Sequence, residues 1–171
     1  MDQIKLYNLE LKTFTEQNVL DYCQINNINP DDITYLDLSD NKLTDISGIK
    51  LFKNLKKLYL DYNRVTDISG IKLFKNLRLL YLNNNEITDI FVLKDLKNLE
   101  ILNISNNQIK DISVIQYLKN LQILRIDYLK LESDQIEYIK LLKNLEELWC
   151  NNGFKKMNNI NQLNENIEIY I

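Results

Sequence analysis

The residue types and spacings in this 171-residue sequence give little support for catalysis. Histidine, the usual general base and metal ligand, is absent. Asp37, Ser39 and Asn41 have the spacing that opens a calcium-binding loop, but Lys42 stands where such a loop needs its glycine. Glycine-rich phosphate-binding motifs are also missing. The sequence therefore predicts no catalytic residue, no metal site and no cofactor.

The overall charge argues against nucleic acid as a ligand. A net charge of −3 and an isoelectric point near 5.1 give a long-range field that repels a phosphate backbone. The apolar runs are too short to cross a bilayer, and the first residues lack the apolar core of a secretory signal. We therefore expect a cytoplasmic protein, monomeric on its own, without membrane insertion. It would be extracellular if a signal peptide had been removed.

Asparagine and aspartate recur at an interval of 22 residues, or 24 before Asn144, and hydrogen bonding explains them without a metal. An interior amide both donates and accepts, so it can pair the backbone groups of a stacked turn. The aspartates precede short Ile-x-x-Ile runs and are expected to cap one-turn helices. A further asparagine before each apolar segment predicts a turn. The three columns are Asn41, Asn63, Asn85 and Asn107; Asp45, Asp67, Asp89 and Asp111; and Asn54, Asn76, Asn98, Asn120 and Asn144.

Apolar residues with the same period predict the secondary-structure elements that position these polar columns. In each unit the fourth and sixth positions are apolar and point to one side of an extended strand, so the third and fifth point outward. One such unit cannot bury its own apolar side chains and must stack on its neighbours, as in a solenoid. The units start at Ile33, Leu55, Leu77, Leu99 and Leu121, and at Leu145 after a longer interval of 24 residues.

Both ends of a solenoid need a cap, and the N-terminal one is predicted to be helical over residues 13–28. Thr15 is the expected N-cap, and Phe14 and Val19 have hydrophobic-staple spacing. Val19, Leu20 and Cys23 are expected to form an inward stripe. Cys23 lies at the opposite end of the array from Cys150, so we expect reduced thiols.

The last unit before the C-terminal region departs from the repeat. Leu129 replaces the interior asparagine, and Asp134 and Glu137 have capping-box spacing, which predicts a longer, more α-helical segment here. Further on, Gly153 replaces the asparagine. The apolar residues expected to close this end are Met157, Ile160, Leu163, Ile167, Ile169 and Ile171.

We predict a single domain over residues 1–171. Residues 1–32 form its N-terminal cap, 33–152 about five to six repeats, and 153–171 its C-terminal cap. Within the first cap, the alternating apolar residues Ile4 and Leu6, then Leu9 and Leu11, predict short extended segments.

The segment LYLDYNRVTDISGIKLFKN (residues 58–76) resembles the 22-residue subclass of leucine-rich repeats found in bacterial internalins and in a regulatory subunit of protein phosphatase 1. The resemblance covers residues 33–152. It implies an α/β leucine-rich-repeat solenoid, a horseshoe with a parallel concave sheet, mostly short 3-10-like convex turns and a helical N-terminal cap. It also implies protein recognition, but no particular partner, because concave residues differ freely between members. The C-terminal region lacks a clear match to the cap motif of eukaryotic nuclear members.

The outward strand positions carry a contiguous strip of aromatic and aliphatic side chains on rungs about 5 Å apart. Tyrosine, tryptophan and arginine are over-represented among interface hot spots. The alternative is that the aliphatic members satisfy only the β-propensity of the sheet. We predict a protein partner that binds at Tyr59, Leu79, Tyr81, Ile101, Ile123, Arg125 and Trp149.

The function predicted from the sequence is that of a non-catalytic protein–protein interaction module with its partner on the concave face. Two alternatives remain open. One is an extracellular internalin-like adhesion fragment of a longer chain. The other is a regulatory subunit of a phosphatase-like enzyme, which rests on analogy of fold alone.

Overall fold

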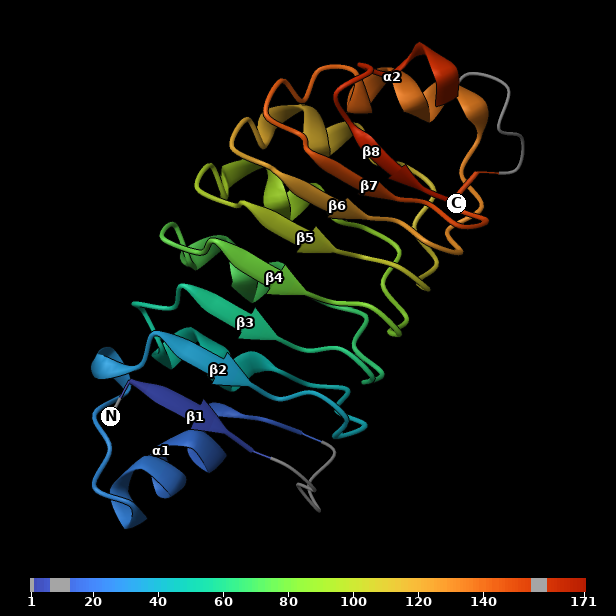
Figure 1. Cartoon of the computed structure of the whole chain (residues 1–171). Helices are drawn as coiled ribbons and strands as arrows, with labels where there is room; N and C mark the ends of the chain where they lie inside the picture. Colours follow the sequence, from blue (N-terminus) through green and yellow to red (C-terminus); the bar gives the residue numbers. More distant parts are fainter. Residues whose placement is uncertain (1, 7–12, 155–159) are drawn as a thin grey trace.

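The computed structural model describes residues 2–6, 13–154 and 160–171, and these residues build one parallel sheet of eight strands in sequence order (Figure 1). Each coil therefore adds one rung beside the rung before it. We call the outward-facing surface of this sheet, away from the short helical turns, the concave face. The strands are β1 (Gln3–Lys5), β2 (Tyr35–Asp37), β3 (Lys57–Tyr59), β4 (Leu79–Tyr81), β5 (Ile101–Asn103), β6 (Ile123–Arg125), β7 (Glu147–Trp149) and β8 (Glu168–Tyr170).

Short 3-10 turns behind the sheet carry the chain back toward the next strand (Figure 1). Each predicted aspartate caps its turn: Oδ1 of Asp67 accepts a hydrogen bond from the backbone N–H of Ser69 at 2.7 Å. The same bond recurs at Asp45, Asp89 and Asp111. The 3-10 turns span Pro30–Asp32, Ser47–Leu51, Ser69–Leu73, Phe91–Asp95, Ser113–Tyr117, Ser133–Gln135 and Ile160–Gln162.

The interior asparagines tie adjacent coils together, as predicted. Nδ2 of Asn85 donates to the carbonyl of Leu60 in the preceding coil at 2.9 Å, and its Oδ1 accepts from the backbone N–H of Val65 at 2.9 Å. Asn63 and Asn107 make the equivalent bonds. Because an unpaired buried backbone group costs about 1–3 kcal/mol, this ladder fixes how one coil sits on the next.

The asparagines that precede the strands also connect coils, which goes beyond the local turn predicted for them. Nδ2 of Asn98 donates to the carbonyl of Lys75 in the preceding coil at 2.8 Å. Asn54, Asn120 and Asn144 make the corresponding bond to their own preceding coils. Each coil is thus held to its neighbour by side-chain amides as well as by the sheet.

Leucines and isoleucines fill the space between the sheet and the 3-10 turns in continuous columns. The central strand leucines, among them Leu58, Leu80 and Leu102, are completely buried. Phe52 and Phe74 are the largest fully buried side chains. No coil closes its core alone, which is why both ends of the stack must be covered.

Helix α1 (Glu16–Ile25) covers the first end of the stack (Figure 1). The side chain of Thr15 accepts from the backbone N–H of Asn18, which confirms the predicted N-cap. Val19 and Cys23 are buried, but the inward position predicted for Leu20 is wrong, because this side chain is 47% exposed. One residue turns a helix by about 100°, so a position next to Val19 cannot share the stripe that residues four apart define.

The first described segment also matches its prediction in part. β1 pairs with β2 and places Ile4 in the core, with Leu6 buried after it. Leu9 and Leu11, for which a second extended segment is predicted, lie outside the described residues.

The irregular coil between β6 and β7 contains the predicted α-helical segment. Helix α2 (Ile136–Ile139) directly follows the 3-10 turn Ser133–Gln135, and Leu129 is buried. The predicted capping box is wrong, because Asp134 lies inside the 3-10 turn and α2 has no side-chain cap. Glu137 instead pairs with Lys140 at 2.6 Å, the cation one turn further on.

At the second end the chain adds one more strand, β8, instead of closing only with a cap. Leu163 and Ile167 are buried, while Ile160 and Ile169 pack against the core from partly buried positions. The closing role predicted for Ile171 is wrong, because it is 74% exposed beyond the last strand. Met157 lies outside the described residues.

Candidate functional site

The parallel register places all seven predicted binding residues on the concave face. Leu79, Ile101 and Ile123 are direct neighbours across β4, β5 and β6. In the adjoining column, Tyr59 pairs with Tyr81 and Arg125 pairs with Trp149. All seven side chains are partly buried and partly open to solvent. The face therefore has an aliphatic column in its middle, with an aromatic group toward each end.

The N-terminal aromatic group is a ladder of three tyrosines, of which the sequence analysis singled out two. The rings of Tyr35 and Tyr59 have centroids 5.3 Å apart, and those of Tyr59 and Tyr81 are 5.1 Å apart. Burial raises the pKa of Tyr35 and of Tyr59 above its usual value. The phenols therefore stay protonated at neutral pH and present hydrogen-bond donors beside apolar ring faces.

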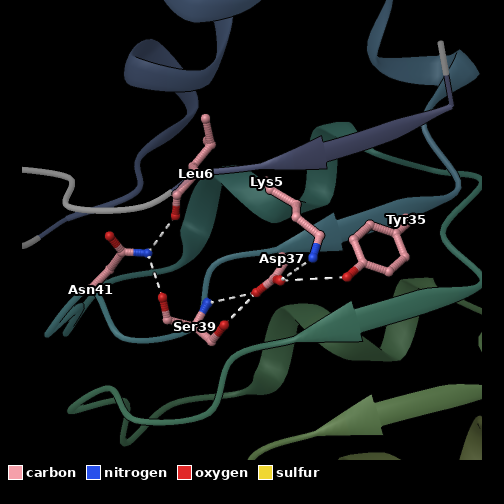
Figure 2. A network of polar contacts seen from close by, with 6 residues as sticks. All are labelled: Lys5, Leu6, Tyr35, Asp37, Ser39 and Asn41. Carbon is pink, nitrogen blue, oxygen red and sulfur yellow. Dashed lines mark hydrogen bonds and ion pairs between the residues drawn. The ribbon is translucent and has the colours of Figure 1, made fainter.

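A polar network fixes the first tyrosine of this ladder (Figure 2). The buried carboxylate of Asp37 lies 3.5 Å from Nζ of Lys5 and accepts from the hydroxyl of Tyr35 at 3.4 Å. It also accepts from the backbone N–H and the hydroxyl of Ser39. The carbonyl of Ser39 in turn accepts from Nδ2 of Asn41 at 3.0 Å, which links the network to the interior ladder. Contacts within the protein thus hold Tyr35 in place.

The C-terminal aromatic group is a stack that includes an arginine. The guanidinium of Arg125 lies 4.5 Å from the ring centroid of Trp149, and the rings of Trp149 and Tyr170 stack at 3.9 Å. Nε1 of Trp149 donates to Glu147 at 3.0 Å. The hydrogen bond to Glu168 is the main cause that raises the pKa of Tyr170. Tyr170 was not among the predicted binding residues, because the repeat pattern fades before β8.

Between the two aromatic groups, at the carboxyl ends of the strands, lies a polar hollow of about 470 Å³. Oδ1 of Asn103 accepts from the backbone N–H of Ser105 at 3.1 Å, and Asp127 accepts from the hydroxyl of Ser105 at 3.1 Å. These bonds fix the positions of three side chains that line the hollow. The hollow is lined by Tyr62, Asn83, Asn84, Asn103, Ser105, Asn106, Arg125, Asp127 and Tyr128.

Neither cysteine is placed as a nucleophile. Burial raises the pKa of the Cys150 thiol to about 12 and raises that of Cys23 as well, so the thiols are protonated at neutral pH. Within residues 2–6, 13–154 and 160–171, no three His, Cys, Asp or Glu side chains gather where they could hold a metal ion. The same residues contain no helix with the length and apolarity that crossing a bilayer requires.

A family profile described as Leucine Rich repeats (2 copies) matches residues 32–73, 75–117 and 97–138. Over this part of the sequence the stacked coils, the interior asparagines and the parallel sheet all follow the same period. The chain belongs to the leucine-rich repeat family, and the α/β solenoid expected from the sequence is confirmed. The curated proteins contain no significant match to the sequence.

Solved structures of bacterial leucine-rich repeat proteins resemble the chain. An internalin (InlF) from Listeria monocytogenes str. 4b F2365 is 29% identical with a TM-score of 0.75, over 81% of this chain and 41% of its own. Internalin C2 from the same strain is 32% identical with a TM-score of 0.69, over 82% of this chain and 60% of its own. A leucine-rich repeat protein from Leptospira interrogans, 24% identical over 100% of this chain and 49% of its own, shares the fold with a TM-score of 0.72. The chain thus spans about half the length of these proteins.

Proposed function

We propose that the chain is a non-catalytic module that binds a protein partner on its concave face. Proteins of this family generally act as protein-interaction modules. The observation that carries the proposal is the contiguous strip of partly exposed aromatic and aliphatic side chains, which the register makes neighbours on successive strands. The proposed anchors are Tyr59, Leu79, Tyr81, Ile101, Ile123, Arg125 and Trp149.

The anchors are already ordered by contacts within the protein, which favours binding. Immobilising a flexible side chain at an interface costs about 0.5–1.5 kcal/mol. Tyr59 and Tyr81 already pack ring against ring, and Arg125 already lies over Trp149. Binding at this face therefore costs less side-chain conformational entropy than binding at a surface of freely moving lysines and glutamates. Aliphatic Leu79, Ile101 and Ile123 between the two groups supply apolar area that the partner can cover.

The test combines affinity purification from the native source with a double variant. Tyr81→Ala together with Trp149→Ala should leave the circular dichroism spectrum unchanged and lower the melting temperature only slightly. The partner identified by mass spectrometry with the unaltered protein should be lost. The matched control is Phe91→Ala with Tyr117→Ala, which removes two exposed aromatic rings from the 3-10 turns behind the sheet. Retention of the partner by the concave variant, or its loss only in the control, would overturn the proposal.

A second candidate function is adhesion, with this chain as part of a longer extracellular protein similar to the internalins. The supporting observation is the likeness to two internalin structures at 29% and 32% identity, of which the chain spans 41% and 60%. The complete reading frame tests it. A secretion signal before these repeats and an anchoring segment after them would support adhesion, and a cytoplasmic reading frame of repeats alone would exclude it.

A further inference from the structure

Two tyrosines at the polar hollow have backbone conformations that tyrosine seldom adopts. The residue three positions after the last residue of each strand from β2 to β7 is left-handed, and it is Asp or Asn at positions 40, 84, 106 and 152. Tyr62 and Tyr128 occupy the same position with φ of 55° and 60°. Asn and Asp tolerate this region because their short side chains hydrogen-bond locally, and a bulky residue gains nothing comparable.

Burial in the core does not account for these two tyrosines. Their side chains are 57% and 51% exposed, so they add little to the core. Tyr62 follows β3 and Tyr128 follows β6, and both line the hollow, whose other residues lie in or directly after β4, β5 and β6. The pair therefore brackets the hollow. Strained residues tend to persist where the strain serves a function.

The hollow also contains polar atoms that the protein leaves unpaired. Oδ1 of Asn83 and Nε of Arg125 are buried and have no hydrogen-bond partner in the described part of the chain. A buried polar atom without a partner costs about 1–3 kcal/mol. One atom is an acceptor and the other a donor, so a ligand that carries both a donor and an acceptor would relieve both.

Arg125 carries a positive charge that no ion pair among the described residues neutralises. The carboxylates around it are engaged elsewhere. Asp127 accepts from the backbone N–H of Asn151 at 2.8 Å and from Ser105, and Glu147 accepts from the indole of Trp149. The guanidinium lies 4.5 Å from the ring centroid of Trp149. The geometry of a guanidinium fits a carboxylate, which it can bind through two parallel hydrogen bonds.

We infer that the hollow between Tyr62 and Tyr128 holds an extended segment of the protein partner, with a carboxylate of that segment paired to Arg125 and a main-chain N–H donated to Asn83. This inference rests on the proposed function and names the part of the partner that the face recognises. Both unpaired atoms are covered by neighbouring atoms, so the side chains of Asn83 and Arg125 turn toward the segment when it binds.

The dimensions of the hollow suit an extended chain. Three strand spacings separate β3 from β6, which is roughly 14 Å at about 4.8 Å per strand. Four residues of extended peptide cover about the same distance at roughly 3.3 Å each. A segment that crosses the strands at this point brings its ends against the exposed tyrosine rings. An uncharged oligosaccharide would also suit the carboxamides, but it would leave the charge of Arg125 unpaired.

The probe is a displayed library of randomised linear nonapeptides, selected against the whole 171-residue protein. Enriched peptides are expected to carry Asp or Glu at one fixed position. Arg125→Met should weaken an enriched peptide at least tenfold, and the affinity should fall as salt rises. Arg64→Met, which removes the same charge at an exposed position outside the hollow, is the matched control and should leave the affinity unchanged.

Variants of the two tyrosines provide a second test, because a purely structural role predicts a different result. Tyr62→Asn and Tyr128→Asn introduce the residue that other coils use at this position. They should leave the melting temperature unchanged or raise it, while weakening the peptide about threefold or more. A fall in melting temperature with unchanged peptide affinity would mean that the tyrosines serve the fold.

The remaining outcomes separate this inference from the proposed function. No enrichment, enrichment without an acidic position, or peptide binding indifferent to Arg125→Met overturns the inference. Binding to an oligosaccharide array with no peptide selected would also overturn it. If the native partner is still lost with Tyr81→Ala and Trp149→Ala in any of these cases, the concave face remains the binding surface. If that double variant still binds the native partner, the proposed function itself is overturned.

Discussion

Twelve consecutive residues, 44–55, recur unchanged as residues 66–77 in the next coil. The two copies adopt the same local structure. Each forms a five-residue 3-10 turn, Ser47–Leu51 or Ser69–Leu73, and in each the preceding aspartate accepts from a serine N–H at 2.7 Å. Identical residues in neighbouring coils therefore give identical backbones, as a stack of nearly independent units requires.

The surroundings of the two copies differ, because the first lies against the N-terminal cap and the second does not. A Cβ at Gly48 would lie 2.5 Å from the carbonyl oxygen of Thr15, whereas nothing lies within 4 Å of the same position at Gly70. The backbone N–H of Gly48 donates to the carbonyl of Phe14 at 2.7 Å. A repeat thus sets its own conformation, while its neighbours decide what each side chain contributes to stability.

The largest expected effects fall on the core phenylalanines, where the two copies should behave almost alike. Phe52→Ala and Phe74→Ala each empty a fully buried site, which costs about 3–5 kcal/mol. Phe52 also stacks on Phe14 with centroids 6.4 Å apart, a contact worth about 0.5–1.5 kcal/mol more. Urea unfolding followed by circular dichroism measures the difference. A much smaller cost at Phe52 would mean that the cap does not complete the core.

The glycines should give the sharpest contrast, because the same change has opposite signs in the two copies. Gly48→Ala forces α1 and its preceding segment away from the first coil and should cost about 2–3 kcal/mol. Gly70→Ala fills open space at a residue without positive φ, and it should stabilise by about 0.4–1 kcal/mol through the unfolded chain. Melting temperatures of the two variants check this. Equal shifts would contradict the packing of the cap on Gly48.

The repeat itself explains which features could be predicted from the sequence. The columns of leucine, asparagine and aspartate each occur several times, so the face that a strand buries and the bonds that Asn85 and Asp67 make follow from the period alone. The outward direction of Tyr81, Ile101 and Trp149 follows from the same alternation. What these residues bind stays a prediction, because a solvent-facing position is under no constraint from the stack.

The wrong and missing predictions concern residues outside the regular repeats, or repeat positions whose residue type the stack does not constrain. Leu20 and Ile171 are outside the repeats, so the 22-residue period gave no check on their predicted burial. Tyr170 stacks on Trp149 through a strand that the fading pattern concealed. The left-handed backbone of Tyr62 could be found only by comparison with the Asn and Asp in the same column of other coils. The departure of Tyr62 from this column of Asn and Asp is therefore the signal that the sequence contains.

The capping aspartates should show a moderate effect that is the same in both copies. Asp45→Ala and Asp67→Ala each remove the acceptor for one backbone N–H and should cost about 0.5–1.5 kcal/mol. Asp45→Asn and Asp67→Asn retain an acceptor oxygen and serve as matched controls, with most of the stability kept. Urea midpoints measure all four. A cost confined to Asp45 would show that the bond matters only beside the cap.

The smallest difference is expected at the lysines of the two copies, where only the first has an ion pair. Nζ of Lys50 lies 2.6 Å from the carboxylate of Glu16 at the start of α1, while Lys72 belongs to no ion pair in the described structure. Both side chains are exposed, so the pair is screened and worth no more than about 0–1 kcal/mol. Lys50→Ala should lower the melting temperature slightly at low salt and less at high salt, while Lys72→Ala should change neither value. A salt-independent loss at Lys50 would instead point to the packing of its aliphatic stem against the cap, which Lys50→Met would restore.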